Sequence, residues 1–260
     1  LVTGPTGSGK STTLYAILDI LNTPDVNIST IEDPIEYQVK RINQTQVRPD
    51  IGLTFASGLR TLVRQDPDII MVGEIRDKET VGLAVNAALT GHLVLSTLHT
   101  NSATGTIPRL LDLGAEPFLV VSTLEVVVAQ RLVRRLTESK EAYNLNASEL
   151  KELGNRVDLD KVLLALKAEH IVSTETTWEN IKFYKPKVTN DDDGYSGRVA
   201  IMEVLSLTPS LRDLIIQGAT GAQLNKQARS EGMLTMLEDG LFKAVQGLTS
   251  IEEVLGAVTE

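Results

Sequence analysis

Short apolar segments alternate with longer segments of helical periodicity through the first half of the chain. The short segments predict strands at Leu1–Thr3, Val26–Ile31, Ile69–Val72 and Leu93–Ser96. Strands that alternate with helices predict an α/β fold, with a mainly parallel sheet flanked by helices on both faces. Ligands of such sheets bind at the carboxyl ends of the strands, so the residues that follow each strand are the first candidates for a functional site.

Helical periodicity predicts the segments that pack against this sheet. Apolar residues recur at helical spacing in five segments: Lys10–Leu21, Phe55–Gln65, Lys78–Leu89, Ala103–Leu113 and Pro117–Leu132. Residues 38–52 are polar and mixed, and their pattern indicates neither a helix nor a strand. Arg131, Arg134 and Arg135 follow the last of these helices, either as a solvated helix end or as a contact to nucleotide or a neighbouring subunit.

The second half of the chain has a different character. Residues 137–197 are polar and lack a clear period, which indicates an insertion. Arg198–Val204 is predicted as a strand, and residues 209–258 as several short helices interrupted by glycines. The chain is therefore expected to divide into an α/β core (1–136), the insertion (137–197) and a C-terminal strand with a helical subdomain (198–260).

A phosphate-binding loop follows the first strand. Gly4–Ser11 matches the Walker A pattern in full, and its glycines let backbone N–H groups converge on phosphate oxygens. We expect Lys10 to reach the β- and γ-phosphates of ATP and the Ser11 hydroxyl to bind Mg²⁺. An ordinary glycine-rich turn is the alternative, but such a turn does not require the whole pattern between a strand and a helix. The residues expected to bind the nucleotide are Gly4, Pro5, Thr6, Gly7, Ser8, Gly9, Lys10, Ser11 and Thr12.

Carboxylates follow two further strands. Glu74 comes directly after the strand Ile69–Val72, where a carboxylate can hold Mg²⁺ directly or through water. Glu32 and Glu36 follow the strand Val26–Ile31 and could align or deprotonate the attacking water. Solvated acids at strand ends are the alternative, and two such clusters in a phosphate-loop protein favour the catalytic interpretation. No acceptor pocket of a kinase is indicated, so water is the simplest phosphoryl acceptor.

Two histidines flank the strand Leu93–Ser96. His99 follows this strand and could hydrogen-bond the γ-phosphate and report its presence, whereas His92 precedes it. A single histidine is more often a surface or core residue than a catalytic one. The position of His99 at a strand end, beside the phosphate site, is the reason to consider it a functional residue.

Composition excludes several other classes. The 260 residues contain no cysteine, which excludes disulfides and cysteine-ligated metals. A net charge of −9 is a poor basis for nonspecific binding to nucleic acid, which needs a surplus of Lys and Arg. No apolar run is long enough to span a bilayer.

Four segments, in order, resemble the motifs of the type II and type IV secretion ATPases. Gly4–Thr13 is similar to their Walker A motif, Ile31–Glu36 to their Asp box, Asp66–Asp77 to their Walker B segment and Thr90–Thr100 to their His box. The second half resembles the branch of pilus-extension and type II secretion ATPases more than the retraction ATPases. The segments that carry this second resemblance are Leu110–Phe118, Ala129–Leu132 and Gly194–Arg198.

The resemblance implies a RecA-like motor. The family assembles as a homo-hexamer with ATP at the subunit junctions, in which Glu36 would be the catalytic base and Glu74 the Walker B acid. His92 and His99 would belong to the nucleotide-sensing His box, and Lys10 and Ser11 would bind phosphate and Mg²⁺. The ring would act at the cytoplasmic face of the inner membrane, peripherally, and drive an inner-membrane platform protein. Pilus assembly is the leading function, and type II secretion is an alternative with the same active-site chemistry.

Two other classes of function are open. One is a non-hydrolysing switch or scaffold, in which ATP binding only sets the conformation; the presence of Lys10, Glu36, Glu74 and His99 argues against it. The other is a DNA-translocating ATPase, which the acidic balance and the lack of aromatic residues among basic ones disfavour.

The insertion is expected to bind no zinc. Family members of the assembly branch often carry four zinc-binding cysteines there, and this chain has Thr137, Lys140, Lys187 and Asn190 at the matching positions. Thr and Lys do not replace thiolates as zinc ligands, so the insertion has to be held by packing or be partly mobile. Elemental analysis of the purified protein should find no stoichiometric zinc, and one zinc per chain would contradict this expectation.

The 260-residue chain is expected to bind ATP and to hydrolyse it slowly. Only three residues precede the phosphate loop, whereas the family has an N-terminal domain that supplies arginines closing over the nucleotide. Arginines of that kind contribute about 10³- to 10⁵-fold to the rate in related enzymes. A phosphate-release assay should therefore show weak turnover and size measurements poor assembly, and vigorous turnover by this chain would contradict the expectation.

Overall fold

A computed structural model describes residues 1–190 and 192–259, which form two compact units. Unit 1 comprises Leu1–Ala129 and Val204–Glu231, and unit 2 comprises Gln130–Glu203 and Gly232–Glu260. The boundaries of these units differ from those of the three predicted segments, 1–136, 137–197 and 198–260. The unit boundaries fall inside two long strands, Val126–Leu136 and Tyr195–Ser206, each of which belongs in part to both units.

The sheet of unit 1 has the expected α/β organisation. Its strands lie in the order β3 (Ile42–Gln46), β2 (Ile28–Glu32), β4 (Ile69–Val72), β5 (Leu93–Leu98) and β1 (Val2–Thr3). Neighbouring strands in this series are all parallel. The sheet continues through β6 (Val126–Leu136), which pairs in parallel with β1, and β9 (Tyr195–Ser206).

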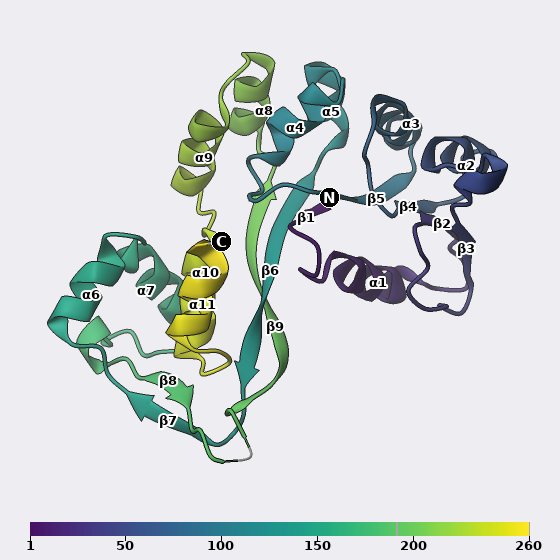
Figure 1. Ribbon diagram of the computed structural model, residues 1–260. Coiled ribbons are helices and arrows are strands. Elements are labelled where there is room, and N and C mark those ends of the chain that lie inside the picture. Colours follow the sequence, from purple (N-terminus) through teal and green to yellow (C-terminus); the bar gives the residue numbers. More distant parts are fainter. Residues whose placement is uncertain (191, 260) are drawn as a thin grey trace. The chain divides into compact units, whose positions relative to one another are not determined.

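Helices cover both faces of this sheet (Figure 1). On one face, α1 (Lys10–Leu21) packs Leu14, Tyr15 and Leu18 against the buried strand residues Ile28 and Met71. On the other face lie α2 (Phe55–Leu62) and α3 (Lys78–Leu89), which begin at the side-chain caps Thr54 and Asp77. The remaining helices of unit 1 are η1 (Pro49–Ile51), α4 (Thr106–Asp112), α5 (Pro117–Thr123), α8 (Pro209–Ile216) and α9 (Gly221–Ser230).

The predicted helix Pro117–Leu132 is wrong in its second half. Helix α5 ends at Thr123, and the chain continues as strand β6 from Val126. Three successive valines begin this strand, and β-branched side chains fit a pleated sheet better than a helix. The three arginines 131, 134 and 135 therefore lie on a strand and not at a helix end. Arg134 donates hydrogen bonds to Glu253 and Asp193 of unit 2, so it is an ion-pair partner within that unit.

Strand β3 was also not predicted. It pairs with β2 in the register Ile28↔Ile42 and carries mostly polar residues. A strand at the edge of a sheet needs few apolar side chains, so residues 38–52 gave no apolar period to detect.

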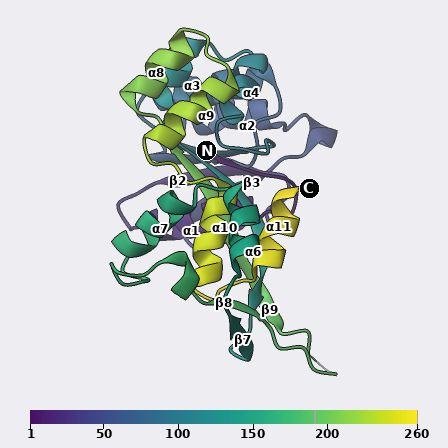
Figure 2. The same ribbon diagram turned by 90° about the vertical axis from the view of Figure 1, so that its left-hand side faces the viewer.

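Unit 2 has a core of its own. Strands β7 (Lys140–Tyr143) and β8 (Phe183–Pro186) pair antiparallel, and Figure 2 shows the helices of the unit gathered beside them. These helices are α6 (Ala147–Gly154), α7 (Leu159–Ala168), α10 (Met236–Val245) and α11 (Ile251–Thr259), with the short helix η2 (Trp178–Asn180). Phe183 and Leu166 are fully buried, and Trp178 stacks on Phe183 with 6.3 Å between ring centroids. The insertion and the C-terminal helices thus share one apolar core.

Lys140 and Thr137, two of the four insertion positions named above, make hydrogen bonds within unit 2. The Lys140 ammonium donates to the carbonyl oxygen of Gly247 at 2.8 Å and lies 5.2 Å from the ring centroid of Tyr184. The Thr137 amide donates to the carbonyl oxygen of Gly194 at 3.0 Å. Within residues 1–190 and 192–259, no three His, Cys, Asp or Glu side chains are grouped closely enough to hold a metal ion.

The helices are short. The longest, α1 and α3, have 12 residues each, whereas a membrane span needs about 20. In the part of the chain that the structure describes, no helix has both the length and the apolar composition to cross a membrane.

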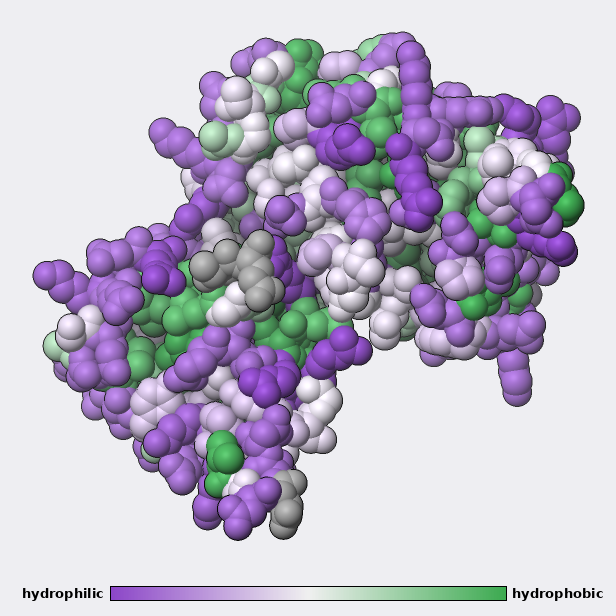
Figure 3. All heavy atoms as spheres, in the orientation of Figure 1, coloured by the Kyte–Doolittle hydropathy of each residue, from purple (hydrophilic) through white to green (hydrophobic). Residues whose placement is uncertain are grey.

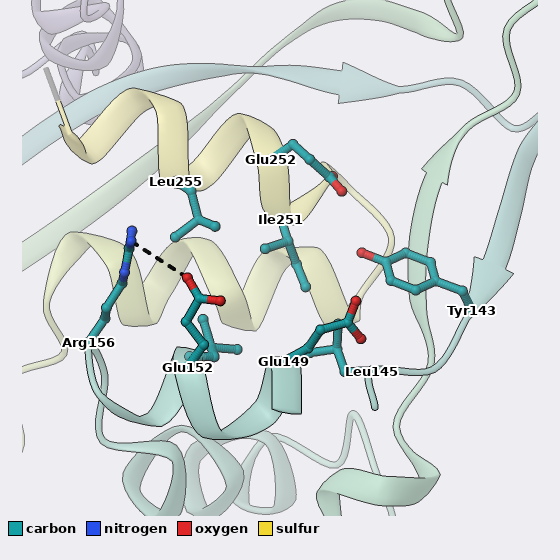
Figure 4. A pocket seen from close by; sticks show the side chains of 9 residues that line it. Tyr143, Leu145, Glu149, Glu152, Arg156, Ile251, Glu252 and Leu255 are labelled. Atoms are coloured by element: carbon teal, nitrogen blue, oxygen red, sulfur yellow. Dashed lines mark ion pairs between the residues drawn. The ribbon is translucent and has the colours of Figure 1, made fainter. Parts of the chain in front are cut away.

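A cavity of about 180 Å³ opens in unit 2 between α6 and α11 (Figure 4). Apolar side chains form its floor, in a unit whose helices bring several apolar side chains to the surface (Figure 3). Glu149, Glu152 and Glu252 stand at its rim, and Arg156 pairs with Glu152 at 3.9 Å. Burial, together with Glu252 and Glu149, raises the pKa of Tyr143 to about 12. The lining holds no lysine and no glycine loop, so this cavity has none of the phosphate-binding features predicted for unit 1.

Close packing of α10 against α11 gives a matched test of the core. A Cβ at Gly240 would overlap Val254 Cγ1 and lie 3.0 Å from Cγ2, whereas a Cβ at Gly256 would meet nothing within 4 Å. We expect Gly240→Ala to lower the free energy of unfolding by about 1–3 kcal/mol through overpacking. Gly256→Ala, in an open helical position, should raise it by up to about 1 kcal/mol. Chemical denaturation of both variants checks this, and equal stability of the two would contradict the packing argument.

Candidate active site

The carboxyl ends of four adjacent strands meet at one edge of the sheet in unit 1. The register pairs Ile31 of β2 with Val72 of β4, Val72 with Ser96 of β5, and Thr97 of β5 with Val2 of β1. Because these strands are parallel, the loops that follow them emerge at the same edge. Those loops carry, in spatial order, Glu36, Glu74, His99 and the phosphate loop Gly4–Gly9. The structure thus brings together four groups that lie up to 95 residues apart in sequence.

The phosphate loop is built around glycines with positive φ. Gly7 and Gly9 have φ of 79° and 85°, a region of backbone conformation that residues other than glycine rarely adopt. Helix α1 begins directly after Gly9, and no side chain caps its N-terminus. The Lys10 ammonium donates to the carbonyl oxygens of Gly4 at 2.9 Å and Pro5 at 3.0 Å. The lysine therefore lies over the loop, at the positive end of the helix dipole.

These residues fit a phosphate group. The uncapped helix N-terminus offers backbone N–H donors, and Lys10 adds a positive charge. Ser11 is exposed in the first turn of α1. Burial lowers the pKa of Lys10, and the Glu74 carboxylate opposes that shift. The strand-end acid Glu74 is therefore close enough to influence the charge of Lys10.

Glu74 is mostly buried between Arg76 and His99. Its side chain is 11% exposed, forms an ion pair with Arg76 and lies 3.3 Å from His99 Nε2. The hydrogen bond to Glu74 raises the pKa of Arg76. The backbone around it is fixed, because the Gly73 amide donates to Ile31 and the Ile75 amide to Thr97. Arg76 belongs to the site, although the sequence alone gave no reason to prefer it over a solvated arginine.

The two glutamates of the Asp box have opposite environments. Glu36 is exposed to solvent. Glu32 is 3% exposed, and its carboxylate accepts hydrogen bonds from the Tyr15 hydroxyl, from Thr30 Oγ1 at 2.5 Å and from Gln44 Nε2 at 3.2 Å. Of the two, Glu36 is the carboxylate that a water molecule can reach.

The structure separates the two histidines of the His box. His99 lies at the carboxyl end of β5, half exposed and beside Glu74. His92 lies just before β5, at the opposite edge of the sheet, where its Nδ1 is 2.8 Å from the carbonyl oxygen of Ala87 and 3.0 Å from Thr90 Oγ1. The six residues of β5 stand between them. Within one chain, therefore, His92 is not part of the cluster around the phosphate loop.

Sequence reasoning missed the partners of Glu32. Tyr15 carried a signal, because it lies among the apolar positions of α1 and a buried tyrosine hydroxyl needs a hydrogen-bond partner. Gln44 carried none, since it lies in an edge strand without an apolar period.

Comparison with known proteins finds relatives in the family that the sequence motifs resemble. Residues 1–256 match the sequence profile of a family described as type II/IV secretion system protein. The chain is 50% identical over 262 residues to type II secretion system protein E of Xanthomonas campestris pv. campestris, covering 100% of this chain and 43% of that protein. It is 50% identical over 258 residues to the type IV pilus assembly ATPase PilB of Myxococcus xanthus, covering 98% of this chain and 43% of that protein. The chain thus spans less than half the length of these relatives.

A solved structure has the same fold. The pilus retraction motor PilT, crystallised with bound ADP, superposes with a TM-score of 0.68 at 31% identity, covering 98% of this chain and 59% of that chain. This similarity confirms the expected RecA-like α/β fold. Since the family profile extends over nearly the whole sequence, the chain belongs to the type II/IV secretion system protein family.

Proposed function

We propose that this chain is the motor domain of an ATP-hydrolysing hexamer that powers type IV pilus assembly. The observation that carries the proposal is the meeting of the phosphate loop, Glu74, His99 and Glu36 at one edge of a parallel sheet. A phosphate site alone would suit a kinase or a switch. A solvent-accessible carboxylate beside it supplies what hydrolysis needs, a group that accepts a proton from water.

Each residue has a defined part in this reaction. Lys10 and the amides at the start of α1 would bind the phosphates, and Ser11 with Glu74 would hold Mg²⁺, directly or through water. When bound, Mg²⁺ neutralises charge on the phosphate oxygens. Glu36 would orient the attacking water and accept its proton.

His99 lies beside Glu74, at the end of the strand next to the one that leads into the phosphate loop. Its Nε2 lies 3.3 Å from Glu74, and half of its side chain is exposed. We infer that it reports the presence of the γ-phosphate to the rest of the ring. Arg76, on the other side of Glu74, restrains the same carboxylate.

The names of the relatives support a place for this chain in a pilus or secretion machine. Relatives at 50% identity are named for pilus assembly and for type II secretion, so type II secretion is the second candidate function. We propose a homo-hexamer at the cytoplasmic face of the inner membrane, attached peripherally, with an inner-membrane platform protein as partner and no nucleic acid. Identification of the copurifying inner-membrane protein distinguishes pilus assembly from secretion.

Hydrolysis should depend on Glu36 and binding on Lys10. In the full-length protein, Glu36→Gln should lower kcat by about 10²- to 10⁴-fold, because the general base is lost. Its affinity for ATP should stay near that of the wild type, whereas Lys10→Ala should lose ATP binding. Phosphate release and nucleotide titration measure the two effects, and Glu175→Gln at an exposed turn of unit 2 is the matched control.

The opposite result would identify another class of protein. Tight ATP binding without phosphate release, unchanged by Glu36→Gln, would indicate a non-hydrolysing switch or scaffold. Hydrolysis stimulated by nucleic acid would indicate a translocase.

A further inference from the structure

One buried hydroxyl connects the helix that follows the phosphate loop with the loop that carries Glu36. Tyr15 is 2% exposed, and its hydroxyl donates a hydrogen bond to Glu32 Oε2. The hydroxyl oxygen of Tyr15 in turn accepts a hydrogen bond from the Glu36 backbone amide at 3.4 Å. Tyr15 therefore contacts both glutamates of the Asp box.

The direction of these hydrogen bonds is fixed. Burial, followed by the hydrogen bond to Glu32, raises the pKa of Tyr15 well above its ordinary value, so the phenol stays protonated at physiological pH. Its single proton goes to Glu32, which leaves the oxygen lone pairs for the Glu36 amide. Thr30 and Gln44 donate to the other oxygen of Glu32, so this carboxylate is held by the protein on both sides.

Other contacts restrain the rest of the same loop but not Glu36. Gln44 Nε2 donates to the carbonyl oxygen of Tyr37 at 3.1 Å, and the Ile35 amide donates to Gln46 Oε1 at 3.4 Å. The Tyr37 ring packs edge-to-face on Tyr15, with 4.6 Å between centroids. At Glu36 itself, the backbone amide donates its hydrogen bond to the Tyr15 hydroxyl.

The placement of Tyr15 on α1 sets a short path to the phosphates. Lys10 begins this helix, and Tyr15 follows five residues later, about 7 Å along the helix axis. The helix that fixes the phosphate-binding lysine therefore also fixes the backbone of the proposed base. Displacement of a reacting group by about 1 Å lowers the rate by about 10²-fold. A hydrogen bond that fixes the position of Glu36 is therefore expected to affect the rate of hydrolysis.

We propose that Tyr15 is a positioning residue for hydrolysis: held by Glu32, its hydroxyl fixes the Glu36 backbone and thereby the direction of the Glu36 carboxylate toward the phosphate loop. The proposal rests on the proposed role of Glu36 as the base. It gives Glu32 a part as a buried partner of Tyr15, away from the reacting atoms.

The test is Tyr15→Phe in the full-length protein. This substitution keeps the ring, its burial and its contact with Tyr37, and removes only the oxygen. We expect kcat for ATP hydrolysis to fall by roughly 10- to 100-fold, while the affinity for ATP changes by less than about 2-fold, because Lys10 and the loop amides are untouched. Tyr37→Phe, in the same loop and 55% exposed, is the matched control and should leave kcat at the wild-type value.

Combination with Glu36→Gln separates positioning from general damage to the protein. If Tyr15 acts through Glu36, the double variant Tyr15→Phe/Glu36→Gln should be no slower than Glu36→Gln alone. A further drop in kcat, of the size seen in the single Tyr15→Phe variant, would mean that Tyr15 acts on stability or on other groups, and would overturn the proposal.

A second measurement does not need turnover. Amide hydrogen exchange at Glu36, followed by mass spectrometry or NMR, should be faster in Tyr15→Phe and unchanged in Tyr37→Phe, with the melting temperature recorded as a check on folding. Unchanged exchange at Glu36, or an unchanged kcat in Tyr15→Phe, would overturn the proposal. If Glu36→Gln itself leaves hydrolysis intact, the proposed base is wrong, and the exchange experiment still decides whether Tyr15 holds this loop.

Discussion

Parallel hydrogen bonding between β2, β4, β5 and β1 is the constraint on which the candidate site depends. The register aligns Ile31 with Val72 and Val72 with Ser96, so the strands end together. A shift of one residue in any strand would turn its side chains to the other face and move its loop along the edge. No contact between the side chains of Glu36, Glu74 and His99 is strong enough to assemble them, and the backbone pairing of buried strands does it for them.

Different environments suit the carboxylates of Glu32 and Glu36 to different roles. Glu32 and Glu36 lie four residues apart, but one is enclosed by hydroxyl and amide donors and the other faces solvent. A buried carboxylate with all its acceptors engaged is rigid and unreactive, whereas an exposed one can exchange protons with water. The enclosed acid serves the exposed one, because its hydrogen bond orients the Tyr15 hydroxyl that the Glu36 amide binds.

What could be predicted from the sequence followed from local pattern. The phosphate loop, the strand-end acid Glu74 and most elements of unit 1 are encoded in contiguous residues, and the structure has the loop after β1 and Glu74 after β4, where the pattern places them. Strand β6 was missed because its valines also suit the end of an apolar helix. The link from Tyr15 to Glu32 joins residues on different elements, and only the packing of α1 on the sheet creates it. His92 shows the reverse case, since nearness to His99 in sequence places the two residues at opposite ends of one strand.

The core of unit 2 has a consequence for the conditions under which this protein can fold. Stacked aromatic rings and aliphatic side chains of α7, α10 and β8 fill it, and the 260 residues contain no thiol. Cohesion of this kind depends on side-chain volume and temperature, and without cysteine no disulfide has to form or to be reduced. Reagents that modify thiols therefore have no target in this chain.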